Sequence, residues 1–393
     1  MPLPDGTRYF DHAATTPTDP RVVERMLPYF SEFFGNASSI YTLGRKSLAA
    51  LDEAHEEIAD ILHCRPTEVI FTGGGSEADN LAIKGIALAE RRRGNHIITS
   101  AIEHHAVLHS CQQLERQGYT VTYLPVDGNG LVDPATVEAA ITDQTALVSI
   151  MYANNEIGTI QPIPEIGRIC RSRRVPFHTD AVQVAGLLDL DVTRLEVDLL
   201  SLSAHKFYGP KGVGVLYLRQ GTRVLPQIVG GSQERNRRAG TENVAGAIGT
   251  VEALRLARAE RDRETVRLAA LRDRLIAGVL TLEGARLTGH PQQRLVSSAS
   301  FTLAGIEGES LLLNLDLMGV AASSGSACSS GDIEPSHVLT ALGLSATDAR
   351  GHLRLTLGHS TSDDDVDFLL EQLPGILQRL RALSAYPAPA AAP

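Results

Sequence analysis

The sequence predicts an α/β fold, in which a mostly parallel sheet of seven strands is covered by helices on both faces and a smaller second domain follows. From about residue 66, short runs rich in Val, Ile, Leu and Thr alternate with stretches of helix length. This alternation is typical of parallel sheets. The chain has 393 residues, more than the roughly 250–300 at which one hydrophobic core stops growing. We therefore expect two domains.

The strand and helix candidates can be placed in chain order. Seven runs are predicted to be strands, at residues 68–72, 96–100, 121–126, 146–151, 175–180, 198–203 and 213–218. Helices are expected between them, at residues 76–93, 103–117 and 164–174. The connection 204–212 is too short for a helical crossover, so the seventh strand is predicted to run antiparallel to its neighbours.

The pattern changes after residue 240. Residues 251–280 are rich in Leu, Ala, Arg and Glu and contain no proline, which predicts one long amphipathic helix leading into the second domain. Strands near 298–303 and 353–357 and closing helices complete that domain. The tail at 386–393, YPAPAAAP, cannot pack and is expected to fray.

Composition excludes several classes of protein. Apolar residues make up 43% and charged residues 21%, the balance of a folded globular chain. The net charge of −10 disfavours nucleic acid as a primary ligand. No apolar run approaches the ~20 residues that span a bilayer, and the start is unlike a signal peptide. The four scattered cysteines form no CxxC pair, so we expect a soluble protein of the reducing cytoplasm.

A glycine-rich turn is the first candidate ligand site. The segment GGGSE at 73–77 lies between a predicted strand and a predicted helix. Its glycines allow close backbone approach, and the helix start offers free N–H groups to an anion, with Ser76 expected at the N-cap. A simple capped turn is the plain alternative. A dinucleotide site is another, because residues 73–78 fit GxGxxA and Glu103 ends the next strand.

Two strand ends carry further candidates. Asp180 ends VPFHTD and is followed by Gln183, while Ser203, His205 and Lys206 follow the next strand. Taken singly, Asp180 could cap a helix and Lys206 could be a surface lysine. Together with an anion turn they match the phosphate, protonated ring nitrogen and aldehyde of pyridoxal 5′-phosphate, with Lys206 as the Schiff-base residue.

The histidines after the second strand invite a metal interpretation. His105 and His109 lie four residues apart, but HExxH is absent and no ligand-spaced cysteine is near. We therefore predict no intrinsic metal, and interpret His104 as a ring that stacks on a flat cofactor.

One cysteine differs from the rest. Cys328 lies in SSGSACSSG at 323–331, a small polar run that is expected to form a mobile loop. An exposed thiol is a strong nucleophile. Cys64, Cys111 and Cys170 are expected to be buried and inert.

These pieces together resemble the cysteine desulfurases of the NifS/IscS type, which belong to the class-V aminotransferase-like enzymes. The similarity extends from FDHAATTP at 10–17 to LRL at 353–355. The matching stretches are FGNASS (34–39), ANNEIGT (153–159), HTDAVQ (178–183), SAHKFYGPKGVG (203–214), RAGTENV (238–244) and SSGSACSSG (323–331). The last is the long form of the cysteine loop.

The resemblance implies a fold and a domain division. The fold would be the aspartate aminotransferase-like fold type I of pyridoxal phosphate enzymes. The large cofactor-binding domain would span 13–255. Residues 1–12 and 256–393 would form the small α+β domain, with the catalytic-cysteine loop at about 322–333.

The resemblance also implies roles for individual residues. Lys206 would hold the cofactor as a Schiff base, Asp180 would pair with its ring nitrogen and His104 would stack on the ring. The remaining contacts would come from Gln183 to the ring hydroxyl, from Gly75, Ser76, Ser203 and His205 to the phosphate, and from Thr241 to the phosphate of the neighbouring subunit of a homodimer. Asn155 would contact cofactor and substrate, and Arg354 the substrate carboxylate. Where the family usually has a threonine, this chain has Ser76.

The implied reaction converts L-cysteine into L-alanine and a persulfide on Cys328. Lys206 would move the α-proton, and Cys328 would attack the substrate sulfur. The persulfide sulfur would pass to acceptor proteins for iron–sulfur cluster assembly, with tRNA thiolation as a further destination. Cys328 would meet a transient cluster on a scaffold protein only in that transfer. Because the C-terminal tail is rich in Pro and Ala, the sequence does not decide whether a scaffold protein docks at the C-terminus.

Two other classes stay open at this point. A pyridoxal enzyme with another substrate, such as a selenocysteine lyase or an aminotransferase, shares the fold, although an aminotransferase has no use for the Cys328 thiol. A nicotinamide-dependent dehydrogenase would explain GxGxxA, but it leaves Lys206, Asp180 and Cys328 without a role.

Overall fold

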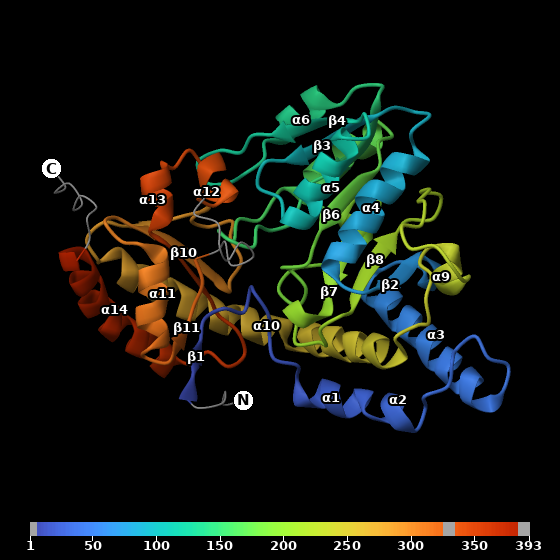
Figure 1. The fold of residues 1–393 in the computed structure, drawn as a ribbon, viewed down its shortest axis with the longest axis horizontal. Helices are drawn as coiled ribbons and strands as arrows, with labels where there is room; N and C mark the ends of the chain where they lie inside the picture. Colours follow the sequence, from blue (N-terminus) through green and yellow to red (C-terminus); the bar gives the residue numbers. More distant parts are fainter. Residues whose placement is uncertain (1–5, 325–334, 384–393) are drawn as a thin grey trace.

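A seven-stranded sheet forms the centre of the larger part of the molecule (Figure 1). The computed structural model describes residues 6–324 and 335–383. The sheet contains, in spatial order, β2 (Val69–Thr72), β8 (Gly214–Leu218), β7 (Leu199–Ser203), β6 (Phe177–Asp180), β5 (Thr145–Ser149), β3 (His96–Ser100) and β4 (Thr120–Leu124). Neighbouring strands are parallel except that β8 runs antiparallel to both β2 and β7. The predicted mostly parallel sheet and its antiparallel seventh strand are confirmed.

Helices cover both faces of this sheet, as its buried strands require. On one face, α4 (Gly75–Ala89) and α5 (His105–Glu115) pack over a core that includes Ile83, Ile97 and Leu114. On the other, α3 (Thr42–Leu62), α6 (Pro134–Ala140), α7 (Ile163–Ser172) and the first half of α10 (Val244–Leu280) enclose a larger core. In such sheets, ligands bind at the carboxyl ends of the strands, here at the ends of β6 and β7.

A second, smaller core includes the second half of α10, which contributes Leu268, Leu271 and Leu275. It is built on the antiparallel sheet of β9 (Ala285–Leu287), β10 (Ser298–Leu303) and β12 (His352–Thr356), with α11 (Gly308–Asp316) and α14 (Asp363–Leu383) packed around it. Phe10 joins this core, and β1 (Arg8–Tyr9) pairs with β11 (Val320–Ala321). The N-terminal segment therefore belongs with the second core, while the boundaries at residues 12 and 255 stay a prediction.

Short helices and turns complete the described chain. They are α1 (Pro20–Met26), α2 (Pro28–Ser31), η2 (Pro66–Glu68), α8 (Val192–Leu195), η3 (Ala204–Lys206), α9 (Gln233–Asn236), α12 (His337–Ala341) and α13 (Ala346–Arg350). Within the described ranges, no helix combines the length and the apolar character needed to cross a membrane. The tail predicted to fray lies outside the described residues.

Some element boundaries differ from the sequence prediction. The long helix begins at Val244 instead of 251, because Asn243 caps it by accepting a hydrogen bond from Gly246 N. The 21-residue helix α3 precedes the first predicted strand and was not predicted. Ser76 is not an N-cap: α4 begins at Gly75 with Gly74 as its cap, so Ser76 lies inside the first turn.

Candidate active site

The amine of Lys206 lies at the centre of the candidate site. Lys206 ends η3, the short turn that follows β7. Its Nζ donates to the carbonyl oxygens of Ala13 at 2.5 Å and Ala14 at 2.8 Å. The two carbonyls hold the amine at the carboxyl edge of the sheet, as predicted for a residue of the turn after β7.

Asp180 ends β6, the strand beside β7, and carries a buried carboxyl group. Burial raises its pKa to about 6, opposed by a hydrogen bond from Val182 N at 2.9 Å and by the charge of Lys206. Asp79 of α4 is also buried, and burial together with the charge of Asp180 raises its pKa. Two buried carboxyl groups this close cannot both ionise easily. Because the Val182 amide and the charge of Lys206 stabilise the ionised form of Asp180, the negative charge of the pair resides on Asp180 and not on Asp79.

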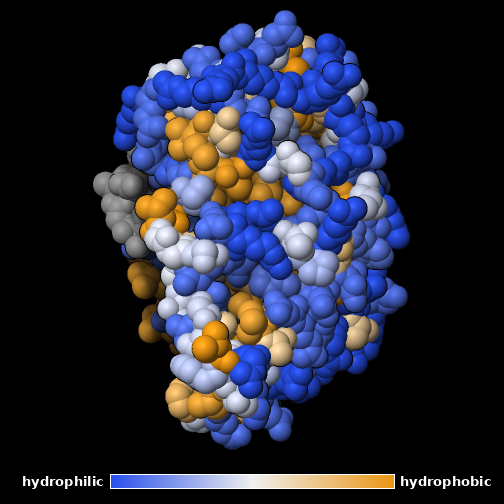
Figure 2. Space-filling view, turned by 90° about the vertical axis from the view of Figure 1, so that its right-hand side faces the viewer, coloured by the Kyte–Doolittle hydropathy of each residue, from blue (hydrophilic) through white to orange (hydrophobic). Residues whose placement is uncertain are grey.

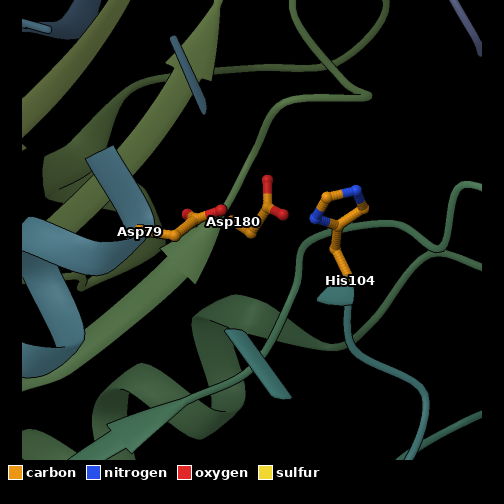
Figure 3. Close-up of side chains that lie close together, drawn as sticks. All are labelled: Asp79, His104 and Asp180. Atoms are coloured by element: carbon orange, nitrogen blue, oxygen red, sulfur yellow. The ribbon is translucent and has the colours of Figure 1, made fainter. Parts of the chain in front are cut away.

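His104 faces Asp180 from the start of α5 (Figure 3). Its Nδ1 accepts a hydrogen bond from Ala106 N at 3.1 Å, which makes His104 the N-cap of this helix. Burial, and next the charge of Lys206, lower its pKa to about 4, so the ring is neutral at pH 7. A neutral imidazole fixed by its cap is suited to stacking on a flat ring.

The three side chains of Figure 3 are also of types that bind metals. Asp79, His104 and Asp180 each offer one ligand atom, and these atoms lie within 4.8 Å of one another. The charge of Lys206 acts on both His104 and Asp180. A resident amine cation disfavours a metal ion here and suits a ligand that reacts with an amine and brings a ring nitrogen to Asp180.

The glycine turn between β2 and α4 has the shape of an anion cradle. Gly74 has φ 148°, a conformation that side chains disfavour. A Cβ on Gly75 would lie 2.9 Å from Val182 Cγ2 and 3.3 Å from Ser203 Cβ, so glycine permits close approach there. Glu77 accepts a hydrogen bond from Gly73 N at 2.8 Å and pairs with Arg238 at 2.9 Å. These contacts fix the turn, and the start of α4 lies close to Ser203 at the end of β7; a helix N-terminus can bind an anion through its free N–H groups.

The N-terminal segment 11–16 joins the two parts of the molecule and was missed as a source of site residues. Besides holding Lys206, Ala13 O accepts a hydrogen bond from Gln183 Nε2 at 3.1 Å. Thr15 Oγ1 lies 3.0 Å from Nδ1 of His205, whose pKa burial lowers to about 4. The motif FDHAATTP was the available signal, but backbone carbonyls leave no trace in a residue pattern.

Arg354 approaches the site from β12 of the second core. Its Nη2 pairs with Asp11 Oδ1 at 2.7 Å and its Nη1 donates to the carbonyl of Asn155 at 3.1 Å. The side chain is buried, and its Nε has no hydrogen-bond partner among the described residues. Burial raises the pKa of Asp11, which Arg354 opposes. A buried guanidinium with a spare donor can bind a carboxylate.

A cavity of about 60 Å³ lies between the two cores. Asn155, Gln183 and Lys206 line it, together with Thr356 and Gly358 of the second core. The other predicted site residues that the structure describes do not line this cavity; they are Gly75, Ser76, His104, Asp180, Ser203, His205, Thr241 and Arg354. Thr241 is exposed, and Cys328 lies outside the described residues.

These residues fit pyridoxal 5′-phosphate. A primary amine, a buried carboxylate, a neutral ring and a glycine cradle would meet its aldehyde, ring nitrogen, ring face and phosphate respectively. The sheet order, with an antiparallel strand between β2 and β7, differs from the all-parallel dinucleotide fold, so GxGxxA loses its support.

Comparisons with known proteins define the class. Residues 8–369 match the family described as Aminotransferase class-V. The chain is 54% identical to cysteine desulfurase IscS of Methanosarcina thermophila over 96% of this chain and 93% of that protein. A solved NifS-like protein superposes with a TM-score of 0.90 at 36% identity, covering 95% of this chain and all of the other. The solved structure of SspA in complex with cysteine superposes with a TM-score of 0.79 at 38% identity, covering 89% of this chain and 99% of the other.

The chain is therefore a pyridoxal phosphate-dependent enzyme of the aminotransferase class-V family. Within that family it belongs to the cysteine desulfurases.

Proposed function

We propose that this chain removes sulfur from L-cysteine, releasing L-alanine and leaving a persulfide on Cys328. The observation that carries the proposal is that the charge of Lys206 acts both on Asp180 and on Asp11, the carboxylate that pairs with Arg354. SspA, 38% identical, was solved in complex with cysteine, which supports the substrate. The long cysteine loop supplies the thiol that an aminotransferase would lack.

The cofactor would be held by residues of several strands, helices and loops. Lys206 would bond its aldehyde carbon, Asp180 would face its ring nitrogen, and His104 its ring face. The further contacts would come from Gln183 and Asn155 and, around the phosphate, from Gly75, Ser76, Ser203 and His205. When bound, pyridoxal phosphate supplies an electron-withdrawing ring that lowers the cost of removing the α-proton of an attached amino acid.

Lys206, Asp180 and Cys328 would carry out the proton transfer, charge stabilisation and sulfur transfer of the reaction. Lys206, released by the incoming substrate amine, takes the α-proton at Nζ. Asp180 keeps its negative charge against the ring because Val182 N and Lys206 stabilise the carboxylate. The Cys328 thiolate would then attack the substrate sulfur, so one S–S bond forms as the C–S bond of cysteine breaks. The electron pair of the broken bond stays with the substrate, whose carbon takes up a proton before alanine leaves.

Arg354 would select an amino acid by its carboxylate. The guanidinium already engages Asp11 and the Asn155 carbonyl, which fix its plane, and its Nε has no hydrogen-bond partner among the described residues. Asn155, one of the cavity residues, would contact the same carboxylate. Desolvation makes this recognition strong, since the arginine is buried.

A homodimer would complete the site. Large apolar side chains are exposed in α2 and in the connections on either side of it, among them Leu27, Phe30, Phe34 and Ile40. Figure 2 views the side on which α3 and α9 lie in Figure 1 and shows exposed apolar side chains there. Such a surface is typical of subunit contacts. Thr241, exposed before α10, would reach the phosphate in the second copy.

The persulfide sulfur would pass to a cytoplasmic acceptor protein, with iron–sulfur scaffolds as the expected class and tRNA-thiolating proteins as another. The persulfide is a sulfur donor that a thiolate can attack, so a protein with an accessible cysteine can accept it.

The test measures alanine and sulfide released from L-cysteine by the purified chain with a reductant. Equal yields are expected, because each turnover frees one of each. Cys328→Ser should keep the yellow cofactor and lose at least ~10³-fold in turnover, since a hydroxyl is a far poorer sulfur nucleophile. Cys111→Ser, at a buried cysteine of α5, is the control that should keep turnover. Full turnover in Cys328→Ser would refute the proposal.

A further inference from the structure

Three consecutive residues of α9 have left-handed backbone angles. Glu234 has φ 45° and ψ 39°, Arg235 has φ 56° and ψ 43°, and Asn236 has φ 63°. None is glycine, so each carries a steric cost that the surrounding structure must offset. Strained backbone of this kind persists where neighbouring contacts over-determine it, and it gathers near functional sites.

A buried contact between α9 and α3 holds this turn. The Glu234 carboxylate lies 3.1 Å from His55 Nε2, and both side chains are almost fully buried. The other ring nitrogen of His55 lies 2.8 Å from the carbonyl oxygen of Leu51, and its ring packs edge-on against Phe71.

The hydrogen bonds of His55 define its protonation pattern. A carbonyl oxygen only accepts, so Nδ1 must carry hydrogen toward Leu51. The short contact of Nε2 with the Glu234 carboxyl then requires a second hydrogen between them. The pair is therefore a hydrogen-bonded clamp with one proton inside the contact, and loss of either partner leaves a buried polar group unsatisfied.

The residues that follow the turn reach the glycine cradle. Arg237 donates to the carbonyl of Thr67 at 2.7 Å, just before β2. Arg238 pairs with Glu77 at 2.9 Å, and Glu77 in turn accepts from Gly73 N at 2.8 Å. The backbone turn at 234–236 sets the direction in which Arg237 and Arg238 extend. The turn and the glycine cradle are therefore linked through the contacts of these two arginines.

The same segment also leads to Thr241. Gln233 Oε1 accepts a hydrogen bond from Gly240 N at 3.1 Å, which closes the loop that starts at the turn. Gly240 has φ 106°, a second left-handed position. Residues 233–240 thus form one closed loop with the turn at its start and Thr241 at its exit.

We propose that His55 and Glu234 are positioning residues of the cofactor site: the clamp between them holds the left-handed turn 234–236, which orients Arg238 toward the glycine cradle and delivers Thr241. Neither residue would touch the cofactor. The part of this inference that concerns cofactor affinity rests on the proposed function, whereas the coupling of the clamp to residues 73 and 233–241 does not.

The experiment first removes the contact between His55 and Glu234 by substitution and then lowers the steric cost of the left-handed turn with a glycine. His55→Leu removes both ring nitrogens, and Glu234→Ala serves as a second breaking variant should His55→Leu not fold. In either, we expect faster amide hydrogen exchange in peptides covering 73–77 and 233–241 of the cofactor-free chain, and about tenfold weaker binding of pyridoxal phosphate, as for an unsatisfied buried group.

A glycine at a strained position should rescue the broken clamp. Asn236→Gly, combined with His55→Leu or Glu234→Ala, lowers the steric cost of the turn and should restore both readouts by several-fold. Ser232→Gly is the matched control, because Ser232 is exposed directly before the turn but has φ −86°. It should not rescue. Glu234→Gln should behave like the wild-type chain, since its amide can donate to Nε2 of a neutral His55.

The outcomes separate this inference from the proposed function. Unchanged exchange at 73–77 in both breaking variants, or equal rescue by the two glycines, would overturn the positioning role. Wild-type protein that fails to bind pyridoxal phosphate would refute the proposed function, while the exchange data would still decide the clamp.

Discussion

The two cores contribute to the candidate site by different structural routes. In the seven-stranded sheet, Asp180 and Lys206 come from the ends of neighbouring parallel strands, β6 and β7. In the second core, Arg354 lies inside the antiparallel strand β12 and reaches the site across the junction, held by Asp11. A parallel sheet gathers residues at one edge by topology alone. The contribution of the second core depends on how the two parts pack.

The segment 11–16 is where these two routes meet. It pairs with the second core through Asp11, and its next residues accept hydrogen bonds from Lys206 and Gln183 of the first. The functional groups of one core are thus held by backbone that is anchored in the other. A change at the sheet edge should therefore affect the chemical step, and a change across the junction should affect substrate binding.

The largest effect is expected at the sheet edge. Lys206→Ala removes the amine that bonds the cofactor and moves the α-proton, so alanine formation should fall by at least ~10³-fold. Borohydride should no longer trap cofactor on the chain. Lys211→Ala, at an exposed lysine of the same turn region, is the control and should keep its rate. Trapping in Lys206→Ala would show that another lysine forms the bond.

A smaller effect is expected across the junction. Arg354→Lys keeps a positive charge beside Asp11 but loses the planar fork, so the KM for L-cysteine should rise ~10- to 100-fold while kcat changes less. Steady-state kinetics measures both, and Arg286→Lys on the exposed face of β9 is the control. A fall in kcat alone would show that Arg354 acts in the chemical step. It would contradict the expectation that the second core affects substrate binding and the sheet edge affects the chemical step.

The smallest effect concerns charge buried at the sheet edge. Glu103 accepts hydrogen bonds from Ser100 and Met151, and burial raises its pKa to about 8 from an ordinary 4.5. The folded state therefore holds a proton that the unfolded state releases, so the contribution of Glu103 to stability is greatest below about pH 4.5 and declines until about pH 8. The decline is at most about 1.4 kcal/mol per pH unit.

Glu103→Gln should remove that decline, because the amide keeps the accepting oxygen and cannot ionise. Denaturant unfolding of the cofactor-free chain at pH 5, 7 and 9 measures the decline in stability. Glu53→Gln, on the exposed side of α3, is the control and should follow the wild-type curve. Parallel curves for wild type and Glu103→Gln would mean that the carboxyl is ionised throughout.

Patterns in the sequence determined the sheet, its antiparallel strand and the strand-end residues. Alternating apolar and helical runs specify a parallel sheet because each strand must be covered on both faces, and the short connection 204–212 leaves no room for a crossover. Asp180, Ser203 and Lys206 follow from that sheet, since parallel strands end at one edge. The role of Arg354 came from the resemblance to a family instead.

Only the tertiary structure decided the contacts between distant parts of the chain. Ala13 and Ala14 hold Lys206 through backbone carbonyls, which every residue type carries and no pattern marks. Asp79 gains its importance from lying beside Asp180, and Glu234 from meeting His55, 179 positions away along the chain. Local sequence sets backbone preferences, but burial and the pairing of buried charges arise when segments far apart pack together.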